Sequence, residues 1–575
     1  MKILKTLFAL LIAVVFSTSL MSQNPYMVKD IFPGAGNGYP AYPAVMNGIL
    51  YFQANDGTNA DEFWRTDGTS DGTYMVKNIN PTGGSMPNSM YLMDNNLYFA
   101  ANDATSGQEL WKSDGTSNGT IMVKNIAPSS QPSRPCYFVK SGNILFFITL
   151  FGMVPNLEYQ LWKTDGTSKG TVKVKEINNK GNDMTFYNHD VNGTLFFTAD
   201  NGKNGRELWK SNGTSTGTVM VKDINPGVAG SHPPNPPNPS NNYAHICCLW
   251  TSHINVDGVF YFAADDGTNG TELWKSNGTS AGTVKVTALN PNLGSYPHWL
   301  TRMGDYLYFS ATNGQTGYEL YRLYLPNGTT SLVYDINPNS DSYPMDLTVM
   351  NNVLYFSATD GTNGRELWKY DGTNIPVNVI DLNGTGDGIN PTMFRHVFYS
   401  DKHFPFQTIN GILFFEGTTA NEGRELWKYD GVTASLVADI NSGTSNCDYG
   451  FPLVYNNKLY FHANDGIYGR ELWVYDPYQP INAPMDVETL QADNYKIDFY
   501  PNPASESLTI SGEFKNNVNL NIKIFDLLGN EMINKEKSSV SRISEQLDIS
   551  SFPAGMYIIN FRFNGQSVQQ KFIKK

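Results

Sequence analysis

The sequence predicts an all-β fold in which a four-stranded antiparallel unit is repeated and a smaller β-domain follows at the C-terminal end. Three observations support this expectation. A pair of short motifs, Leu-Tyr-Phe and Glu-Leu-Trp, recurs nine times. Aromatic residues make up 13% of the 575 residues and charged residues only 16%, which is typical of many short strands joined by tight turns. Asp-Gly pairs separate the apolar runs, and glycine there allows the positive φ of a hairpin turn.

The two motifs keep a fixed spacing along the chain. Twelve residues separate the phenylalanine that ends the first motif from the aromatic residue that ends the second in eight units, and fifteen residues separate them in the third unit. A spacing that repeats nine times defines a structural unit. The second motif ends at Trp64, Trp111, Trp162, Trp209, Trp274, Tyr321, Trp368, Trp427 and Trp473.

The second unit shows how its strands can be assigned. Apolar runs predict strands at Tyr91–Met93, Leu97–Ala101, Glu109–Ser113 and Ile121–Ile126, with turns between them. We name them strands a, b, c and d of the unit. Four antiparallel strands in about 47 residues form a blade of a β-propeller.

The ends of the array indicate how it closes. Met27–Ile31 matches strand d of the other units, for example Met75–Ile79, whereas the last unit stops after Trp473 with no strand d of its own. The first segment can therefore complete the last blade, which protects both edge strands. Nine units imply a single closed propeller of nine blades. Eight blades are the alternative if one unit is irregular, and the unit of Tyr321 is the most divergent.

The residues present in every unit are expected to be structural. Glutamate precedes the last two residues of the second motif in eight units, and Gln160 replaces it in the third. A group that every blade carries is most simply a packing or hydrogen-bonding element, and the tryptophans are expected to form the core between blades. The same interpretation applies to the arginines beside the glutamate, which are Arg206, Arg365, Arg424 and Arg470.

The first 22 residues have the pattern of a signal peptide. Lys2 and Lys5 precede the apolar stretch Leu7–Val15, and small residues follow, with cleavage expected near Ser22. The stretch is short for a membrane span, and an N-terminal membrane anchor is the alternative. No second apolar run is long enough to cross a membrane, so no transmembrane segment is expected in the mature chain.

Charge and cysteine content narrow the possible partners. The formal net charge is -13, and the absence of a basic run argues against nucleic acid, whose phosphates require a Lys/Arg patch. Export permits disulfides, but four cysteines in so long a chain are not a disulfide scaffold. The sequence leaves the pairing of Cys136, Cys247, Cys248 and Cys447 open.

The second motif resembles a known repeat. Residues 109–116 read Glu-Leu-Trp-Lys-Ser-Asp-Gly-Thr, with copies at 207–214, 272–279 and 366–373. They resemble the ELWxxDGT repeat family, which is known chiefly from exported proteins of Bacteroidota. The resemblance covers residues 27–476 and implies a β-propeller at residues 23–476. It implies no particular activity.

The C-terminal residues resemble a different family. Residues 477–492 read as a linker, and residues 493–575 contain Phe499–Ala504, Ile522–Gly529 and Pro553–Tyr557. These segments resemble the type A sorting domain of the type IX secretion system. The resemblance implies a small Ig-like β-sandwich handled by the type IX secretion machinery. It also implies passage through the periplasm and across the outer membrane, then removal of the tail, with release of the propeller or its attachment to surface lipopolysaccharide. A generic adhesion-type Ig domain is the alternative.

Differences in length between the units point to one face of the propeller. Two long insertions, at residues 226–248 and 383–407, fall in connections from strand d to the next strand a. Three extra residues of the third unit fall between strands b and c, near Phe151–Asn156. In an antiparallel meander both kinds of connection emerge on the same face. Variable loops on a rigid scaffold usually carry binding sites, so we expect the site on this face.

Aromatic residues gather in the same connections. Beside Asn and Asp they suit a carbohydrate ring or a peptide. The alternative is that the recurring Tyr-Pro pairs only fix the start of strand a. The ligand-binding candidates are Tyr243, Trp250, Tyr296, His298, Trp299, Tyr343, Tyr449 and Phe451.

The sequence predicts no metal, cofactor or catalytic residue. Seven of the eight histidines lie on or next to connections between strands d and a, but no spacing such as His-Glu-x-x-His occurs. The Asp-Gly-Asn loops admit a Ca²⁺ interpretation, yet they lack the spacing to a distal glutamate, so plain turns are expected.

Three functions remain open. The first is an exported cell-surface or secreted binding protein whose unknown partner is a glycan or a protein, as in adhesion. The second is a glycan hydrolase or lyase on the elaborated face, where Asp387, Arg395, His396 and His403 are not repeated. The third is a structural component of the cell surface. A pocket in which non-repeated ionisable side chains meet favours an enzyme over a binding protein.

Overall fold

A computed structural model describes two compact units of β-structure. It describes residues 24–127, 131–152, 158–178, 186–231, 253–389, 406–477, 488–492, 495–500, 504, 506–525, 531–553, 555–563 and 566–574. These residues form strands and turns and no helix. Asn24–Asp476 make up one unit, and the residues from Pro477 onward belong to the other. The N-terminal 22 residues that we expect to be a signal peptide lie outside the described residues.

The described residues of the larger unit form nine four-stranded antiparallel sheets. The first three consist of β2 (Ala41–Met46), β3 (Ile49–Asn55), β4 (Asp61–Thr66) and β5 (Tyr74–Lys77); β6 (Asn88–Met93), β7 (Asn96–Asn102), β8 (Gln108–Ser113) and β9 (Ile121–Lys124); and β10 (Cys136–Ser141), β11 (Ile144–Phe151), β12 (Glu158–Thr164) and β13 (Val172–Lys173). The next three consist of β14 (Phe186–Val191), β15 (Thr194–Asp200), β16 (Arg206–Ser211) and β17 (Val219–Lys222); β18 (His253–Val256), β19 (Val259–Asp265), β20 (Thr271–Ser276) and β21 (Val284–Lys285); and β22 (His298–Met303), β23 (Tyr306–Thr312), β24 (Tyr318–Tyr324) and β25 (Thr329–Tyr334). The last three consist of β26 (Met345–Met350), β27 (Val353–Thr359), β28 (Arg365–Tyr370) and β29 (Val377–Ile380); β30 (Gln407–Ile409), β31 (Ile412–Thr419), β32 (Gly423–Tyr429) and β33 (Ala434–Ala438); and β34 (Gly450–Tyr455), β35 (Lys458–Asn464), β36 (Arg470–Tyr475) and β1 (Tyr26–Lys29).

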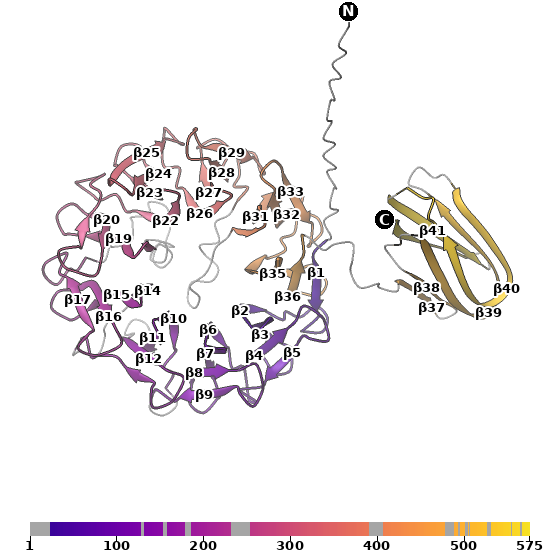
Figure 1. The fold of residues 1–575 in the computed structure, drawn as a ribbon, viewed down its shortest axis with the longest axis horizontal. Coiled ribbons are helices and arrows are strands. Elements are labelled where there is room, and N and C mark those ends of the chain that lie inside the picture. Colours follow the sequence, from indigo (N-terminus) through magenta and orange to yellow (C-terminus); the bar gives the residue numbers. More distant parts are fainter. Residues whose placement is uncertain are drawn as a thin grey trace, which may run out of the picture. The chain divides into compact units, whose positions relative to one another are not determined.

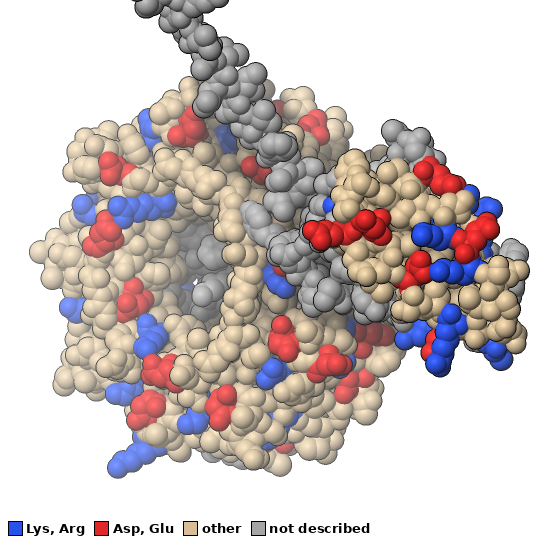
Figure 2. Space-filling model, turned by 45° about the vertical axis from the view of Figure 1, so that its right-hand side comes forward, with Lys and Arg blue, Asp and Glu red and all other residues tan. Residues whose placement is uncertain are grey.

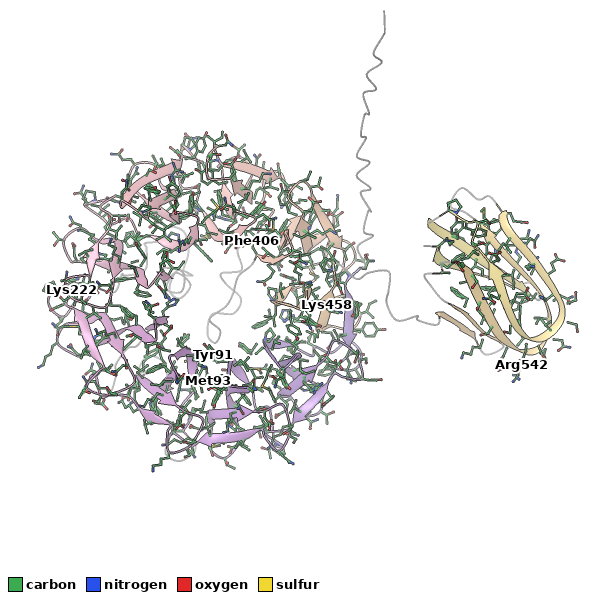
Figure 3. The ribbon with its side chains drawn as sticks, viewed as in Figure 1. Tyr91, Met93, Lys222, Phe406, Lys458 and Arg542 are labelled. Atoms are coloured by element: carbon green, nitrogen blue, oxygen red, sulfur yellow. The ribbon has the colours of Figure 1, made fainter. Side chains whose placement is uncertain are left out.

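The nine sheets stand around a ring like the blades of a propeller (Figure 1). The first strand of each sheet lies nearest the centre, and the last strand lies at the circumference. Figure 3 shows this radial order, because Tyr91 and Met93 of β6 lie at the inner edge of the ring and Lys222 of β17 lies at its outer edge.

The unit of Tyr321, the most divergent in sequence, forms a sheet as regular as the others. Its strands β22 to β25 form a complete sheet, and Tyr321 is buried at the tryptophan position. Strand boundaries differ from the expectation in two places. A bulge between Asn88 and Tyr91 lets β6 begin three residues early. β9 ends at Lys124 because the backbone N–H of Ile126 donates to the Glu109 carboxylate at 2.8 Å.

The last and first sheets are joined by the same lysine contact that joins consecutive sheets. β1 pairs with β36 and supplies the fourth strand of the last sheet, as the sequence predicts. Lys29 of β1 donates to the carbonyl oxygen of Thr73 in the first sheet at 2.7 Å. Lys77 of β5 makes the same contact with Thr120 of the second sheet, also at 2.7 Å. The contact that links neighbouring sheets therefore also links the two ends of the array.

The core of this unit lies between the sheets. Trp111 of β8, for example, packs in one cluster with Phe63 and Val76 of the preceding sheet. The residues at this position that are buried are Trp64, Trp111, Trp209, Trp274, Tyr321 and Trp368. Those that are partly exposed are Trp162, Trp427 and Trp473. Each sheet is thus held to its neighbour by large aromatic side chains.

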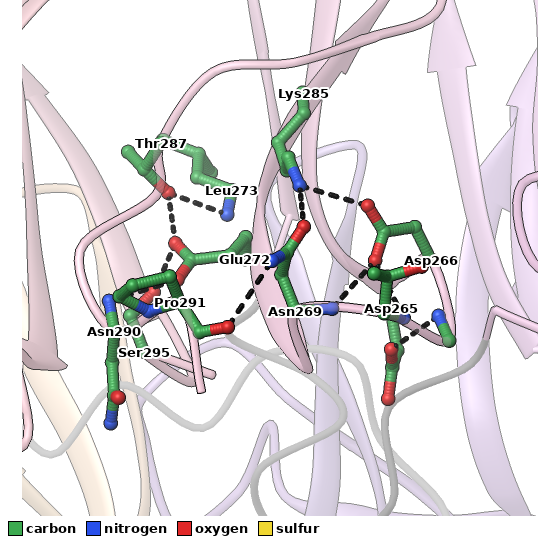
Figure 4. A network of polar contacts seen from close by, with 12 residues as sticks. Asp265, Asp266, Asn269, Glu272, Leu273, Lys285, Thr287, Asn290, Pro291 and Ser295 are labelled. Carbon is green, nitrogen blue, oxygen red and sulfur yellow. Dashed lines mark hydrogen bonds and ion pairs between the residues drawn. The ribbon is translucent and has the colours of Figure 1, made fainter. Parts of the chain in front are cut away.

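In eight of the nine sheets a buried glutamate near the start of the third strand fixes the connection to the next sheet. Glu319 accepts hydrogen bonds from the backbone N–H of Ile336 at 2.9 Å, from the N–H of Ser342 at 3.1 Å and from the Ser342 hydroxyl at 2.6 Å. Figure 4 shows the equivalent network around Glu272. The same kind of network surrounds Glu62, Glu109, Glu207, Glu366, Glu425 and Glu471.

Burial raises the pKa of these glutamates, and the hydrogen bonds that they accept oppose the rise. The pKa of Glu319 is raised to about 7. The pKa of Glu366 and that of Glu471 are raised to about 8. In their connections, Gly388 and Gly38 stand at the position that Ser342 occupies in the connection bound by Glu319. The Ser342 hydroxyl lowers the pKa of Glu319, and Gly388 and Gly38 provide no such donor.

The C-terminal unit is a six-stranded antiparallel assembly. It consists of β37 (Glu488–Ala492), β38 (Tyr495–Tyr500), β39 (Ser507–Phe525), β40 (Glu531–Asp548), β41 (Gly555–Phe563) and β42 (Gln566–Lys574). The long strand β39 pairs with β38 through its first half and with β41 through its second half, while β40 pairs with it along both. β37 lies inside the range that the sequence predicts to be a linker.

Removing the hydroxyl from the glutamate network should destabilise the larger unit. We expect Ser342→Ala to lower the free energy of unfolding by about 1–3 kcal/mol, because the buried Glu319 loses a donor. Urea denaturation followed by tryptophan fluorescence reports this unit alone, since all ten tryptophans lie between residues 64 and 473. Ser340→Ala, at an exposed serine of the same connection, is the control. Equal effects of the two variants would contradict the role of the network.

The raised pKa values also make stability depend on pH. The folded unit binds a proton at Glu366 more tightly than the unfolded chain, where a glutamate titrates near 4.5. The contribution of this group is therefore fully present below about pH 4.5 and is lost as the pH rises through about 8. Glu366→Gln should flatten the fall in unfolding free energy between these two values. The exposed Glu176→Gln should not, and equal slopes would show that Glu366 is not the group responsible.

Candidate functional site

A backbone contact places two residues side by side where one sheet connects to the next. The first is the residue before the buried glutamate, and the second lies just before the next sheet. The backbone N–H of Met86 donates to the carbonyl oxygen of Asp61 at 3.0 Å, and that of Arg134 donates to Gln108 at 3.1 Å. We call these residues variable pairs, because their side chains differ from sheet to sheet. The pairs are Asp61/Met86, Gln108/Arg134, Thr271/Tyr296, Tyr318/Tyr343, Arg365/Ile389 and Arg470/Tyr39.

Most second members of the pairs have an unusual backbone conformation. Tyr39, Met86, Arg134, Tyr296 and Tyr343 have φ between 44° and 49°, and a proline follows each of them. A left-handed conformation in a non-glycine residue costs roughly 1 kcal/mol. The glutamate network holds the residue directly before each of them. The side chains of these five residues are exposed or half-buried, and that of Met86 is 56% exposed.

The structure places the aromatic candidates of the sequence in two different environments. Tyr296 and Tyr343 are half-buried second members of variable pairs. The other four are buried: His298, Trp299, Tyr449 and Phe451. Burial lowers the pKa of His298 to about 4, and its Nδ1 lies 2.8 Å from the carbonyl oxygen of Tyr296. Tyr243 and Trp250 lie outside the described residues.

Several pairs are occupied by contacts within the protein. The rings of Tyr318 and Tyr343 stack with their centroids 5.2 Å apart. The guanidinium of Arg470 lies 5.3 Å from the centre of the Tyr39 ring and pairs with Asp448 at 2.8 Å. In both pairs the side chains therefore contact other residues of the protein.

The residues considered for catalysis do not form a site in the described part of the chain. Asp387 accepts the backbone N–H of Arg365 at 2.8 Å. In other sheets the N–H of the residue before the buried glutamate is accepted in the same way, by Asn37, Asp341 and Asn446. The role of Asp387 is therefore repeated and structural. Arg395, His396 and His403 lie outside the described residues.

A pocket of about 520 Å³ opens between the first and second sheets. Two variable pairs contribute to its wall, Asp61/Met86 and Gln108/Arg134. The remaining lining residues are Tyr42, Gln53, Asn88, Asn102, Gly107 and Pro132. The pocket lies on the face where the connections between strands d and a and between strands b and c emerge, because residues of both kinds line it. Its size is within the range of small-molecule sites.

The polar groups of the pocket differ in how far they are engaged. Asn88 donates to the carbonyl oxygen of Met86 at 3.0 Å, and Asn102 accepts the backbone N–H of Ala104 at 2.8 Å. The Oδ1 atom of Asp61 is buried and accepts no hydrogen bond within the described residues. Burial raises the pKa of this carboxyl. The pocket therefore offers amide groups and one carboxylate to a ligand.

The sequence did not single out Asp61, Gln108 or Arg134. The first two stand next to the repeated glutamate, where the arginines of other units suggested a structural role. The available signal was the variety at that position, which reads Asp61, Gln108, Tyr159, Arg206, Thr271, Tyr318, Arg365, Arg424 and Arg470.

The turn carboxylates and the cysteines show local structural contacts. Asp67 accepts the N–H and hydroxyl of Thr69, and Asp56 accepts the N–H groups of Thr58 and Asn59. No group of three His, Cys, Asp or Glu side chains in the described residues is arranged to hold a metal ion. Cys136 and Cys447 are buried and form no disulfide within the described residues, and Cys247 and Cys248 lie outside those residues.

The surface of the protein mixes both signs of charge. Figure 2 shows Lys and Arg interspersed with Asp and Glu, with no extended basic patch on the face in view. Among the described residues, no helix is long and apolar enough to span a membrane.

The C-terminal unit matches a family model. Residues 498–575 match the model described as the secretion system C-terminal sorting domain. This domain implies handling by the type IX secretion system. It indicates a protein that is secreted, or attached at the cell surface, by way of the periplasm.

The structural comparisons give distant likenesses. PorZ of Porphyromonas gingivalis, a bacterial surface component of the type IX secretion system, matches at 11% identity and a TM-score of 0.31, over 93% of this chain and 75% of that one. A puromycin hydrolase matches at 12% identity and a TM-score of 0.33, over 74% of this chain and 60% of that one. A puromycin-hydrolysing peptidase of Mycobacterium tuberculosis matches at 9% identity and a TM-score of 0.36, over 77% of this chain.

The chain spans about three fifths of the length of the two hydrolases. The TM-scores lie below 0.5, so no function is transferred from any of these structures. The search of curated proteins found no match.

A buried aromatic candidate and an exposed member of a variable pair should differ in the effect of truncation to alanine. Trp299→Ala should lower the free energy of unfolding by about 3–5 kcal/mol, because it empties a buried site. Met86→Ala should change it by no more than about 0.5 kcal/mol, because the side chain is mostly exposed. Urea denaturation measures both values. A large loss in Met86→Ala would mean that the variable pairs belong to the structural core.

Proposed function

We propose that this protein binds saccharides at the cell surface or in the medium, through the pocket between its first two sheets. The observation that carries the proposal is the lining of that pocket. Three residues with side-chain amides, Gln53, Asn102 and Gln108, line the pocket together with Tyr42. Amides donate and accept hydrogen bonds as sugar hydroxyls require, and an aromatic ring packs against the apolar face of a pyranose.

The arrangement favours binding over catalysis. A hydrolase of glycosides requires two carboxyl groups that flank the scissile bond. The described lining of the pocket contains one carboxylate, that of Asp61. We therefore propose a binding protein for a glycan ligand, as the sequence suggested.

The proposal includes the architecture that presents the pocket. We propose that the larger unit is a single closed β-propeller of nine blades from the ELWxxDGT repeat family. The strand pairing of β1 with β36 and the Lys29 contact support closure. A closed ring of this kind has no free sheet edge at its ends.

We also propose that the C-terminal unit is an Ig-like sandwich that is removed after export, with release of the propeller or its attachment to lipopolysaccharide. The hydroxyl of Tyr557 donates to the carbonyl oxygen of Pro553 at 2.8 Å. A tyrosine that bonds to the backbone a few residues upstream is typical of Ig-like sandwiches.

Filling the pocket should abolish saccharide binding. Gln108→Tyr introduces a large side chain at a position where other units carry Tyr159 and Tyr318, so the fold should accept it. We expect saccharides that bind the full-length protein on a glycan array to lose at least about tenfold in affinity with this variant. Lys169→Tyr, on an exposed turn of the opposite face, is the control. An array without hits, or hits unaffected by Gln108→Tyr, would overturn the proposal.

A further inference from the structure

The carboxylate of Asp61 is the one charged group of the pocket without a partner. Within the described residues no hydrogen-bond donor and no cation contacts it, and its Oδ1 is buried. Charged residues at the same position of other sheets are engaged. Arg365 donates to the carbonyl oxygen of Tyr343 at 2.8 Å, and Arg470 pairs with Asp448. Within the described part of the chain, no cation thus neutralises the carboxylate that the pocket holds.

The positive charge of the pocket is directed elsewhere. Arg134 lines the same pocket, but its Nη1 donates to the carbonyl oxygen of Gly152 at 2.7 Å and lies 3.4 Å from that of Leu150. Both carbonyls belong to the third sheet or the residue after it. The guanidinium is therefore held towards the third sheet, whereas Asp61 belongs to the first sheet on the other side of the pocket.

We infer that the pocket selects a saccharide that carries a protonated amino group, with the ammonium bound to Asp61. This inference rests on the saccharide binding proposed above. An ionised carboxylate accepts hydrogen bonds and donates none, so it requires a donor. A charged donor makes a hydrogen bond about twice as strong as a neutral one, and partial burial reduces the screening of the pair by water. The net charge of -13 further favours the approach of cationic ligands.

The neighbouring amides suit the rest of such a ligand. Gln53 lines the pocket, and its amide makes no hydrogen bond within the described residues. The amide NH₂ of Asn102 is available, because only its oxygen is engaged, by the N–H of Ala104. Hydroxyl groups of an amino sugar can both donate to and accept from these amides. A lysine side chain would satisfy Asp61 and leave the amides unused, so we favour the amino sugar.

Two trisaccharides that differ only at nitrogen test the inference. The probes are the trimer of glucosamine, which is cationic, and its fully N-acetylated counterpart, which is neutral. Calorimetric titration of the full-length protein near neutral pH should give at least about tenfold tighter binding of the cationic trimer. Asp61→Asn should remove this preference. Asp305→Asn, an exposed carboxylate on the turn between β22 and β23, makes the same change of charge and should keep it.

A measurement on the unaltered protein provides a second test. Added salt should weaken binding of the cationic trimer more than binding of the N-acetylated trimer, because only the first forms an ion pair. Equal salt dependence would overturn the inference.

The possible results distinguish the inference from the proposed function. If both trimers bind equally, and Gln108→Tyr weakens both while Asp61→Asn weakens neither, the selectivity for an amino group is wrong and saccharide binding stands. If neither trimer binds and the array shows no hits, both proposals fail. A lysine-containing tripeptide that binds through Asp61 when neither trimer does would also overturn the inference in favour of a peptide ligand.

Discussion

The buried glutamate of the third strand is the interaction on which the repeat unit depends. A carboxylate removed from water is costly unless hydrogen bonds compensate it, and Glu319 obtains them from the connection that leads to the next sheet. The connection also requires the carboxylate, because its backbone N–H groups would otherwise lie buried without an acceptor. In eight of the nine units, one side chain therefore fixes the backbone of the connection between consecutive sheets.

This division of roles explains why the variable pairs can differ. Their two residues are held by a backbone hydrogen bond, such as that from Met86 to Asp61, which any side chain permits. The network positions the backbone, and the aromatic cores between sheets provide most of the stability. The side chains of the pairs are left free to be Met, Tyr, Arg or Asp. A surface of this kind can change its ligand without a change in the fold.

The sequence was sufficient for the repeat and insufficient for the site. Fixed spacing predicted nine units, and the match between Met27–Ile31 and the fourth strand of other units predicted the pairing of β1 with β36. The spacing of the motifs contains no information on the bulge in the first strand of a sheet, such as that in β22. Trp299 lies in this bulge and has a positive φ of 59°. The bulge turns this ring into the core, so an aromatic residue that looked like part of a surface loop is buried. Asp61 was overlooked because it stands beside a residue whose role is structural.

The isolation of Asp61 is consistent with a site kept for a ligand. A partly buried carboxylate without a partner lowers stability, and burial raises its pKa as a sign of that cost. The scaffold tolerates the cost because neither the glutamate network nor the core between sheets involves this carboxylate. Arg470, at the same position of the last sheet, pairs with Asp448. In the inference proposed above, a bound ammonium group offsets the energetic cost at Asp61, which has no partner within the described lining of the pocket.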